Sequence, residues 1–185
     1  MDVVEAINKR RAYRSLDPVE ITDELITELA KAAQLFCSCF NKQPWRYVFV
    51  YDKEILKQLH SALAPGNEWA QSASMIIVVF SKPEFDCIMK DGRRYYLFDT
   101  GMATAAMILR ATELELVAHP IAGYSPDKVK EILNIPSDME IITLVIVGRH
   151  SEKINPVLSE KQIEAENNRP ERQGFEKFVW YNKYN

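Results

Sequence analysis

The sequence lacks the residue patterns by which many classes of enzyme are recognised. It has no G-x-S-x-G, no H-E-x-x-H, no phosphate-binding loop and no G-x-G-x-x-G. The 3 histidines, His60, His119 and His150, have no sequence neighbours that suggest a catalytic triad or a metal site, so a structural role is expected for each. The sequence therefore offers no recognisable protein acid, base or nucleophile that could carry a reaction.

Cysteines are also few. The chain has 3, an odd number without the spacing of a disulfide scaffold. Cys37 and Cys39 form a C-x-C, but the second pair or nearby histidines of a metal site are missing. We therefore expect free thiols, no bound metal and a reducing, cytoplasmic compartment.

An excess of positive charge and a long apolar run are missing as well. The formal net charge is -3 at pH 7, which argues against binding to nucleic acid through phosphate contacts. No apolar segment follows a basic start, so no signal peptide is expected. The longest apolar stretch, around 101–109, ends at Arg110 and is too short to span a bilayer. We expect neither a nucleic-acid partner nor a membrane partner.

The patterns that are present predict one α+β domain over residues 1–185. Apolar periodicity and capping residues predict helices, and short runs of aromatic and branched residues predict strands. The expected helices are 2–11, 22–36, 53–63, 99–117 and 126–135, and the expected strands are 47–51, 75–80 and 141–147. Because the strands are few, we expect a layered domain and not a doubly wound one.

Two segments suggest a second subunit. The helix at 99–117 is apolar nearly all round and rich in small residues, which is typical of a helix buried in a core or at an interface. After Gly148 the chain becomes polar, and it then ends in the aromatic, β-prone FEKFVWYNKY. We interpret 149–185 as a polar excursion followed by an arm that docks on a partner chain.

Four stretches offer groups that suit a single ligand. They contain Arg10, Arg11, Arg14, Asn41, Gln43, Gly123, Arg149, Arg169 and Arg172. Taken alone, each stretch has an ordinary explanation: a favourable charge at a helix end, a turn or a solvated surface. Together, the guanidinium groups suit a phosphate, the amides suit the edge of a heteroaromatic ring, and the glycine loop allows close backbone approach. Flavin mononucleotide (FMN) has all three parts.

The same stretches resemble the short form of the nitroreductase family of flavoproteins along nearly the whole chain. RRAYRSLDP is similar to the family's R-R-S-x-R-x-[FY] signature, and CSCFNKQPWRYVFV to its P-S-x-x-N-x-Q-P-W segment. LVAHPIAGYSPDKVKEILNIP resembles the central glycine loop and the helix after it. RPERQGFEKFVWYNKY resembles the closing R-x-R-x-P-[LF]-E-E-[IV] segment. Four such motifs in the right order indicate the family.

The resemblance implies a central, mostly antiparallel sheet flanked by helices, in a homodimer with a domain-swapped C-terminal arm. It implies one FMN at each end of the dimer interface, contacted by both chains. The residues that match the phosphate and pyrimidine contacts are Arg10, Arg11, Ala12, Arg14 and Arg172. Those that match the segment beside the ring, supplied by the partner chain, are Cys37, Ser38 and Cys39, while Asn41 and Gln43 match the family's N-x-Q pair, with Asn41 the better candidate for flavin contact. Those that match the loop facing the N5 and O4 side of the ring are Pro120, Ile121, Ala122 and Gly123.

The sequence departs from the family pattern at three places. Ala12 stands where serine is usual, Cys37 stands where proline is usual, and Gln173-Gly174 replaces a basic-Pro pair. These differences affect individual contacts and remove none of the central anchors. Trp45, which follows the amide pair, is expected to be a core residue at the start of a strand.

The activity implied is that of an NAD(P)H-dependent oxidoreductase. NAD(P)H gives hydride to flavin N5, and a small-molecule acceptor such as a nitroaromatic or a quinone then takes the electrons in a ping-pong cycle. One alternative is another flavin enzyme with the same fold, a reductive dehalogenase or a flavin-fragmenting enzyme, with the stretch 81–96 as a substrate lid. A second alternative is a dimeric FMN-binding protein without turnover. The sequence does not distinguish NADH from NADPH or identify the physiological substrate.

Overall fold

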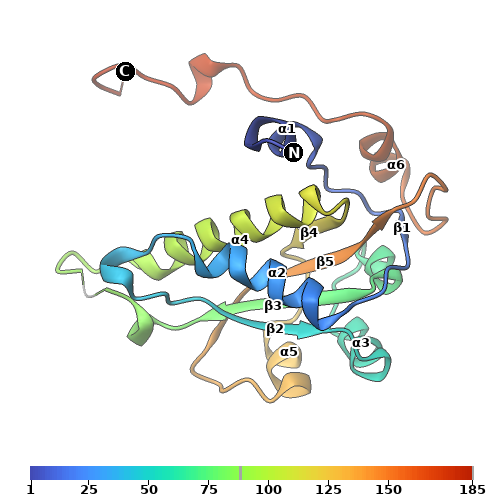
Figure 1. The fold of residues 1–185 in the computed structure, drawn as a ribbon, viewed down its shortest axis with the longest axis horizontal. Helices are drawn as coiled ribbons and strands as arrows, with labels where there is room; N and C mark the ends of the chain where they lie inside the picture. Colours follow the sequence, from blue (N-terminus) through green and yellow to red (C-terminus); the bar gives the residue numbers. More distant parts are fainter. Residues whose placement is uncertain (88, 185) are drawn as a thin grey trace.

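A computed structural model describes residues 1–87 and 89–184 of the chain. Helices and strands alternate along most of it (Figure 1). The helices are α1 Val3–Lys9, α2 Asp23–Gln34, α3 Lys53–His60, α4 Tyr95–Glu113, α5 Pro126–Leu133 and α6 Glu160–Asn167. The strands are β1 Leu16–Asp17, β2 Arg46–Val50, β3 Met75–Ser81, β4 Val117–Ile121 and β5 Glu140–His150.

Polar side chains begin the helices where the sequence predicts them to begin. The Asp2 carboxylate accepts the Glu5 N–H at 2.7 Å, and the Thr22 hydroxyl accepts the Leu25 N–H at 3.2 Å. Asp52 caps α3, and Ser125 caps α5 ahead of a proline in its first turn. These caps satisfy N–H groups that have no partner inside a helix, so four of the five predicted helices are confirmed in outline.

The prediction of a helix over 99–117 is wrong at both ends, since the helix already begins at Tyr95. Helix α4 stops at Glu113, and Val117 begins strand β4. The chain leaves the helix at Glu115, which has a φ of 61°, and the Leu116 N–H then closes the turn on the Ala111 carbonyl at 2.8 Å. Glycine usually takes this left-handed position. A glutamate there gives the sequence no visible stop signal.

Each pair of neighbouring strands that the structure describes is antiparallel. Strand β3 lies between β2 and β5, and β5 also pairs with β4 and, through its last two residues, with β1. All seven residues of β3 are buried, as expected for a strand covered on both faces. Strand β2 pairs with β3 alone among the described residues, so one of its edges is free.

Different helices cover the two faces of the sheet (Figure 1). Side chains alternate between the faces along a strand. Ile76 and Val78 of β3 pack with apolar residues of α3 and α5, whereas Ile77 and Val79 pack with apolar residues of α2 and α4. Helix α1 lies on α4. Among the described residues, no helix is both long and apolar enough to cross a membrane.

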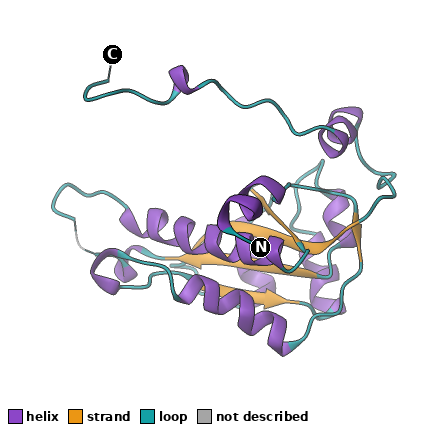
Figure 2. Cartoon of the chain, turned by 45° about the horizontal axis from the view of Figure 1, so that its top comes forward, coloured by secondary structure: helices purple, strands orange, loops and turns teal. Residues whose placement is uncertain are grey.

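The C-terminal segment leaves this body. Residues 168–184 run along one side and end well away from the sheet (Figure 2). The segment makes one short turn, Phe175–Lys177, and bends again at residues 181–183, and Phe175 and Tyr181 are 77% and 85% exposed. The apolar end thus finds no cover on its own chain, and no described residue of it belongs to a strand.

The expectation of three free thiols is wrong. Cys39 and Cys87 form a disulfide between residues 48 apart in the sequence, and only Cys37 is a free, exposed cysteine among the described residues. A sequence separation that long leaves no local pattern from which the pairing could be predicted. The reducing, cytoplasmic compartment was inferred from free thiols, and it stays a prediction.

Candidate functional site

Five arginines gather where the two ends of the chain meet. We call Arg10, Arg11, Arg14, Arg169 and Arg172 the arginine cluster. With Ala12, Ala165 and Pro170 they line a cavity of about 200 Å³ between the segment after α1 and the segment after α6. The structure therefore brings together five of the six candidate arginines; the sixth, Arg149, belongs to β5.

Two of these arginines hold the backbone together. The Arg11 guanidinium donates to the carbonyl oxygens of Ala165 and Glu166, at 2.9 and 3.2 Å, where α6 approaches its end. The Arg169 guanidinium donates to the carbonyl oxygens of Asn8 and Arg10 at the end of α1. Each thus satisfies carbonyls that a helix leaves unpaired at its C-terminus.

The other three guanidinium groups have no such partner. Those of Arg10, Arg14 and Arg172 form no hydrogen bond or ion pair with a residue that the structure describes. Burial lowers the pKa of Arg10, and the positive charges of Arg169, Arg172 and Arg11 lower it further. Burial also lowers the pKa of Arg14, against the opposing charge of Glu166. A bound anion would relieve both costs, since an opposite charge favours the charged form of each arginine.

Glu166 orients the first arginine segment, and sequence reasoning missed it. Its side chain is buried, and its two carboxylate oxygens accept the backbone N–H groups of Arg14 at 2.7 Å and Ser15 at 3.1 Å. These bonds fix the turn from which the Arg14 side chain projects. Glu166 lies in an acidic, polar stretch of sequence, where nothing distinguishes it from its exposed neighbours.

An aromatic layer lies beneath Arg14. The rings of Trp69 and His119 stack with their centroids 4.7 Å apart, and the Arg14 guanidinium carbon lies 5.9 Å from the Trp69 ring. Nδ1 of His119 donates to the Tyr13 carbonyl at 3.1 Å. Burial lowers the pKa of His119 to about 4, so the ring is neutral at pH 7. His119 therefore has a structural position, as expected from the sequence.

The layer connects the arginines to the loop at 120–123. His119 belongs to β4, which ends at Ile121, and Pro120 and Ala122 are exposed. The Gly123 carbonyl accepts N–H groups from Ala64 at 2.9 Å and from the Asn67 side chain at 3.0 Å. A Cβ on Gly123 would lie 2.3 Å from the Asn67 amide nitrogen. Asn67 is thus a structural reason for this glycine that requires no ligand.

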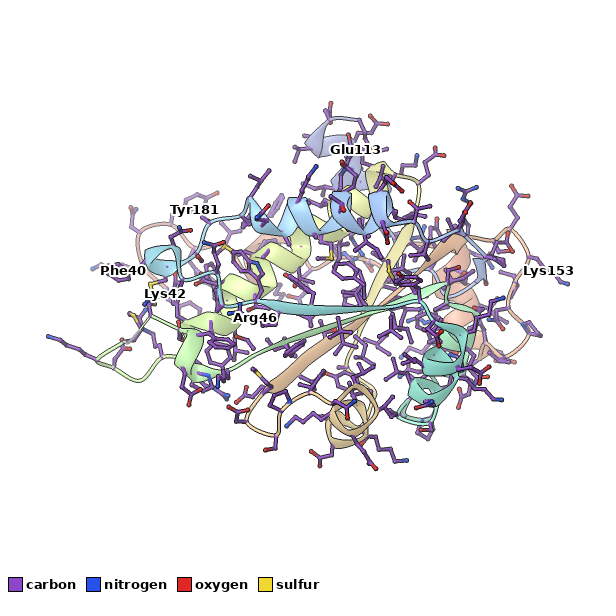
Figure 3. All side chains as sticks on the ribbon, turned by 60° about the horizontal axis from the view of Figure 1, so that its bottom comes forward. Phe40, Lys42, Arg46, Glu113, Lys153 and Tyr181 are labelled. Atoms are coloured by element: carbon purple, nitrogen blue, oxygen red, sulfur yellow. A yellow bond between two sulfur atoms is a disulfide. The ribbon has the colours of Figure 1, made fainter. Side chains whose placement is uncertain are left out.

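The loop at residues 37–43 lies elsewhere in the same chain. Cys39 donates its N–H to Asp99 near the start of α4, whereas Arg11 shares a cavity with Thr112 near its end. At 1.5 Å per residue, those two helix positions are roughly 20 Å apart. Figure 3 shows Phe40 and Lys42 projecting at the end of the molecule opposite Lys153. One chain therefore does not bring Asn41 and Gln43 to the arginine cluster.

The backbone of this loop is unusual. Phe40, Asn41 and Gln43 all have positive φ angles, of 47°, 54° and 49°. The Ser38 hydroxyl accepts the Gln43 N–H at 2.9 Å, and the Gln43 side-chain amide donates to the Asn41 side chain at 3.2 Å. The two amides therefore contact each other in this chain. Trp45, just beyond, is buried against α4 and its neighbours, which confirms its core role.

The stretch at 81–96, the candidate lid, is anchored at its ends. Lys82 pairs with Asp138 at 2.7 Å, and Glu140 accepts hydrogen bonds from Arg94 and from the Tyr96 hydroxyl. The disulfide of Cys87 joins it to loop 37–43. Residue 88 lies outside the described residues. Whether the stretch closes over a substrate stays a prediction.

Known proteins resemble this chain in sequence. The model of a family described as the nitroreductase family matches residues 7–71 and 64–149. A protein of Archaeoglobus fulgidus, provisionally named NADH dehydrogenase/NAD(P)H nitroreductase, is 29% identical over 151 residues, 80% of this chain and 84% of its own.

Two solved structures illustrate the likeness of fold. One, described as an oxidoreductase containing FMN, has a TM-score of 0.84 and 26% identity, and it covers 100% of this chain and 94% of its own. Another, from Exiguobacterium sibiricum and described as a nitroreductase in complex with FMN, has a TM-score of 0.79 and 21% identity over 98% and 97% of the two chains.

Proposed function

Because the chain belongs to the nitroreductase family, we propose that it transfers hydride from NAD(P)H, through bound FMN, to a small-molecule acceptor such as a nitroaromatic or a quinone. FMN is its cofactor and NAD(P)H its reductant, in keeping with the names of its relatives. The observation that carries the proposal is the set of three guanidinium groups, on Arg10, Arg14 and Arg172, that converge on one cavity without partners among the described residues.

The arginine cluster fits the phosphate of FMN. A phosphate offers several acceptor oxygens and a negative charge, and arginine binds such groups through paired N–H donors. The cavity of about 200 Å³ is smaller than the ~300–1,000 Å³ of pockets that enclose a whole drug-sized ligand. We therefore assign it the phosphate end only, with the flavin ring extending beyond it.

The chain's own residues divide the binding work. Arg10 and Arg172 hold the phosphate, while Arg11 holds the end of α6 in place. Arg14, anchored by Glu166 through its backbone, lies nearer the ring because it projects over the Trp69 layer. The loop 120–123 then faces the ring, with the Gly123 carbonyl held by the Asn67 side chain.

FMN supplies the redox chemistry when it is bound, by accepting hydride at its N5 and passing electrons on. The protein is left to bind, orient and provide positive charge. This division of work agrees with the residues present, because His119 is neutral, buried and hydrogen-bonded to backbone. No residue of the arginine cluster is required to exchange a proton.

The ring still needs cover, and we propose that a second copy of the chain provides it. An apolar hollow of about 470 Å³ opens on the outer side of α4, beside α1 and the end of α2. Its lining includes Val3, Ala6, Phe36, Met102, Ala106 and Leu109. An apolar surface of this kind marks an interface. In a homodimer, loop 37–43 of the partner would bring its amides to this chain's flavin.

The C-terminal arm is the second part of the proposed dimer. Its large apolar side chains, Phe175, Phe178, Val179, Trp180, Tyr181 and Tyr184, are exposed on their own chain. Burying each would stabilise the assembly by roughly 1.5–3 kcal/mol. We propose that the arm crosses to the partner. The apolar hollow and the free edge of β2 are the surfaces open to it, since an unpaired edge strand accepts an added strand.

The experiment that tests this function begins with the absorption spectrum of the purified protein. We expect a yellow protein that releases FMN on heating and is bleached by NADH without oxygen. Steady-state oxidation of NAD(P)H with a quinone should give parallel double-reciprocal lines, as one site serves two substrates in turn. A colourless protein that does not bind added FMN would contradict the proposal. Binding without turnover would favour the non-catalytic alternative.

A further inference from the structure

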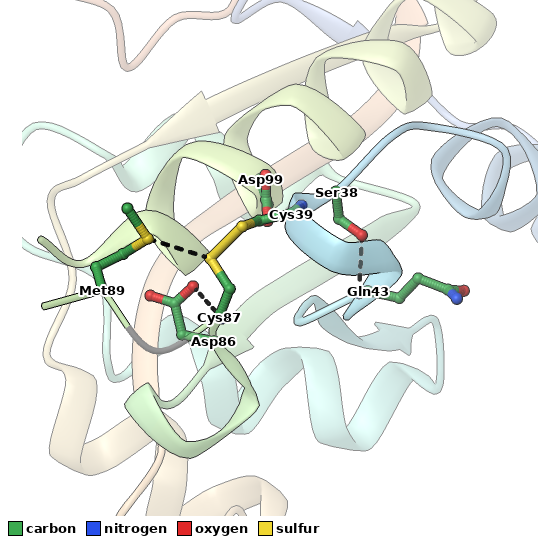
Figure 4. The surroundings of a disulfide bond; sticks show 7 residues. All are labelled: Ser38, Cys39, Gln43, Asp86, Cys87, Met89 and Asp99. Carbon is green, nitrogen blue, oxygen red and sulfur yellow. Dashed lines mark hydrogen bonds between the residues drawn. A yellow bond between two sulfur atoms is a disulfide. The ribbon is translucent and has the colours of Figure 1, made fainter.

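Loop 37–43 carries a feature that hydride transfer does not use, the disulfide between Cys39 and Cys87. It joins the short turn Cys39–Asn41 to the segment that follows the turn Pro83–Phe85 (Figure 4). Cys87 is buried at 3% exposure, whereas Cys39 is partly exposed and Cys37, two residues away, is a free, exposed thiol. A reductant in solution therefore reaches the cross-link from the Cys39 side.

The cross-linked loop holds a costly backbone conformation. Phe40, Asn41 and Gln43 are in the left-handed region, which costs a residue other than glycine roughly 1–2 kcal/mol. Such a conformation persists only where the surroundings over-determine it. The restraints here are the Ser38–Gln43 and Asn41–Gln43 hydrogen bonds, the bond from Cys39 N–H to Asp99, and the disulfide.

The disulfide is the restraint that ties the loop to the lid candidate. The salt bridges of Lys82 and Arg94 hold the ends of that stretch to Asp138 and Glu140. Among the described residues, no hydrogen bond or ion pair joins 87–92 to 37–43. Cleavage of the S–S bond therefore frees the middle of the stretch from the loop and leaves the loop with its local bonds alone.

Asp99 adds a reason to expect a stable reduced form. Its Oδ2 accepts the Cys39 N–H at 3.0 Å, while its Oδ1 is buried without a hydrogen-bond partner among the described residues. Figure 4 shows Asp99 lying against Cys39. A disulfide sulfur has no hydrogen to donate, whereas a thiol has one. Reduction therefore adds a donor to Cys39, the residue that Asp99 already contacts, while Oδ1 of Asp99 lacks a partner among the described residues.

We propose that Cys39 and Cys87 form a reducible dithiol/disulfide site that takes electrons from dithiols and controls how firmly loop 37–43 is held. Because that loop carries Asn41 and Gln43, the site also controls flavin affinity; this second half rests on the proposed function. The oxidised form is the one that holds the loop ready, and the reduced form loosens it.

The chemistry is ordinary thiol–disulfide exchange. A thiolate of the dithiol attacks Sγ of Cys39, the S–S bond breaks, and Cys87 leaves as a thiolate that takes up a proton. The second thiol of the reagent then displaces Cys39 from the mixed disulfide, and Cys39 leaves as a thiol. Two electrons and two protons pass to the protein, and the dithiol becomes a disulfide.

The first test needs no flavin. FMN-free protein is treated with dithiothreitol, freed of the reagent without oxygen, and compared with untreated protein. A thiol reagent under denaturing conditions should find one thiol per chain before treatment and three after it. Hydrogen exchange of the backbone at 37–43 should be faster in the reduced protein. Three thiols that no oxidant can pair, or identical exchange in the two forms, would overturn the site.

The second test measures FMN affinity in both forms. Reduction should raise the Kd for FMN about fivefold or more, the lower end of usual coupling between sites. Cys87→Ser should behave like the reduced protein and ignore dithiothreitol, whereas Cys37→Ser should keep the difference between the two forms. Equal affinity in both forms would refute the control of flavin binding. A protein that binds no FMN in either form would instead refute the proposed function, and the exchange result would still stand.

Discussion

The arginine cluster draws its contacts from both ends of the chain, whereas loop 37–43 draws its contacts from within itself, from α4 and from one disulfide. In the cluster, Arg11 and Arg169 each donate to backbone carbonyls on the other terminal segment. Glu166 accepts two backbone N–H groups from the segment that carries Arg14. In the loop, the amides of Asn41 and Gln43 meet each other. A cluster fixed by long-range contacts is complete in one chain. In loop 37–43, the side-chain amides of Asn41 and Gln43 form hydrogen bonds only within the loop among the described residues, and the arginine cluster of the same chain does not lie beside them.

Removing the arm is the strongest way to break this comparison. A chain that ends at Gly174 loses six large apolar side chains, of which even two buried anchors would contribute about 3–6 kcal/mol. We expect the dimer to weaken by at least about a hundredfold. Analytical ultracentrifugation should then show a concentration-dependent monomer. A chain that ends at Asn182 keeps most of the apolar arm and is the matched control. If the shorter chain stays dimeric at the same dilution, the arm belongs to its own subunit.

A second change affects the cluster alone. Arg10→Ala removes a guanidinium that has no protein partner, so the fold should persist while FMN binding weakens. Hydrogen bonds to charged groups contribute about 1.5–3 kcal/mol, which corresponds to a rise in the FMN Kd of about 10- to 150-fold. Fluorescence titration measures it. Arg149→Ala, which removes the same charge from outside the cavity, should have little effect. Equal losses of FMN affinity in the two variants would show that the phosphate was assigned to the wrong arginine.

The third and smallest effect concerns the contact that orients the cluster. Glu166→Gln replaces one of two buried acceptor oxygens by an NH₂ that faces a backbone N–H. The free energy of unfolding should fall by about 1–3 kcal/mol. Urea unfolding of the FMN-free protein measures it. Glu164→Gln makes the same change on the exposed side of α6 and should stay within about 0.5 kcal/mol of the original. An equal loss of unfolding free energy in both variants would mean that the buried hydrogen bonds of Glu166 do not hold the segment that carries Arg14.

The sequence predicts the local features of this fold well. Caps such as Asp2, Thr22 and Ser125, followed by apolar periodicity, are signals within one helical turn, and the structure has those caps. The apolar runs of β3 and β5 are equally plain. The end of α4 is not, because Glu115 takes a position usual for glycine. Strand β1 has two residues, too few for any pattern, and α6 lies in a polar stretch without an apolar face.

The candidate site shows the same difference between features with a local sequence signal and features without one. Charged and amide residues in recurrent motifs can be listed from the sequence, and five of the six candidate arginines do line one cavity. The residues that hold these site residues in place cannot be identified from the sequence. The contacts of Glu166 with Arg14, of Asn67 with Gly123 and of Cys39 with Cys87 all join segments that are distant along the chain. Such pairs form only after the sheet is assembled, so no window of sequence contains both partners.

The position of the arginine cluster at the meeting point of the two chain ends has a consequence for synthesis. A ribosome makes Arg10 and Arg14 before the strands of the sheet, and Glu166, Arg169 and Arg172 after them. The sheet and α4 lie between them, and β5 is complete at His150. A nascent chain can therefore form its sheet first, whereas the proposed phosphate site also needs the segment after α6. Under the proposed function, a chain translated only as far as β5 would have the sheet but an incomplete arginine cluster, and it would therefore bind FMN poorly.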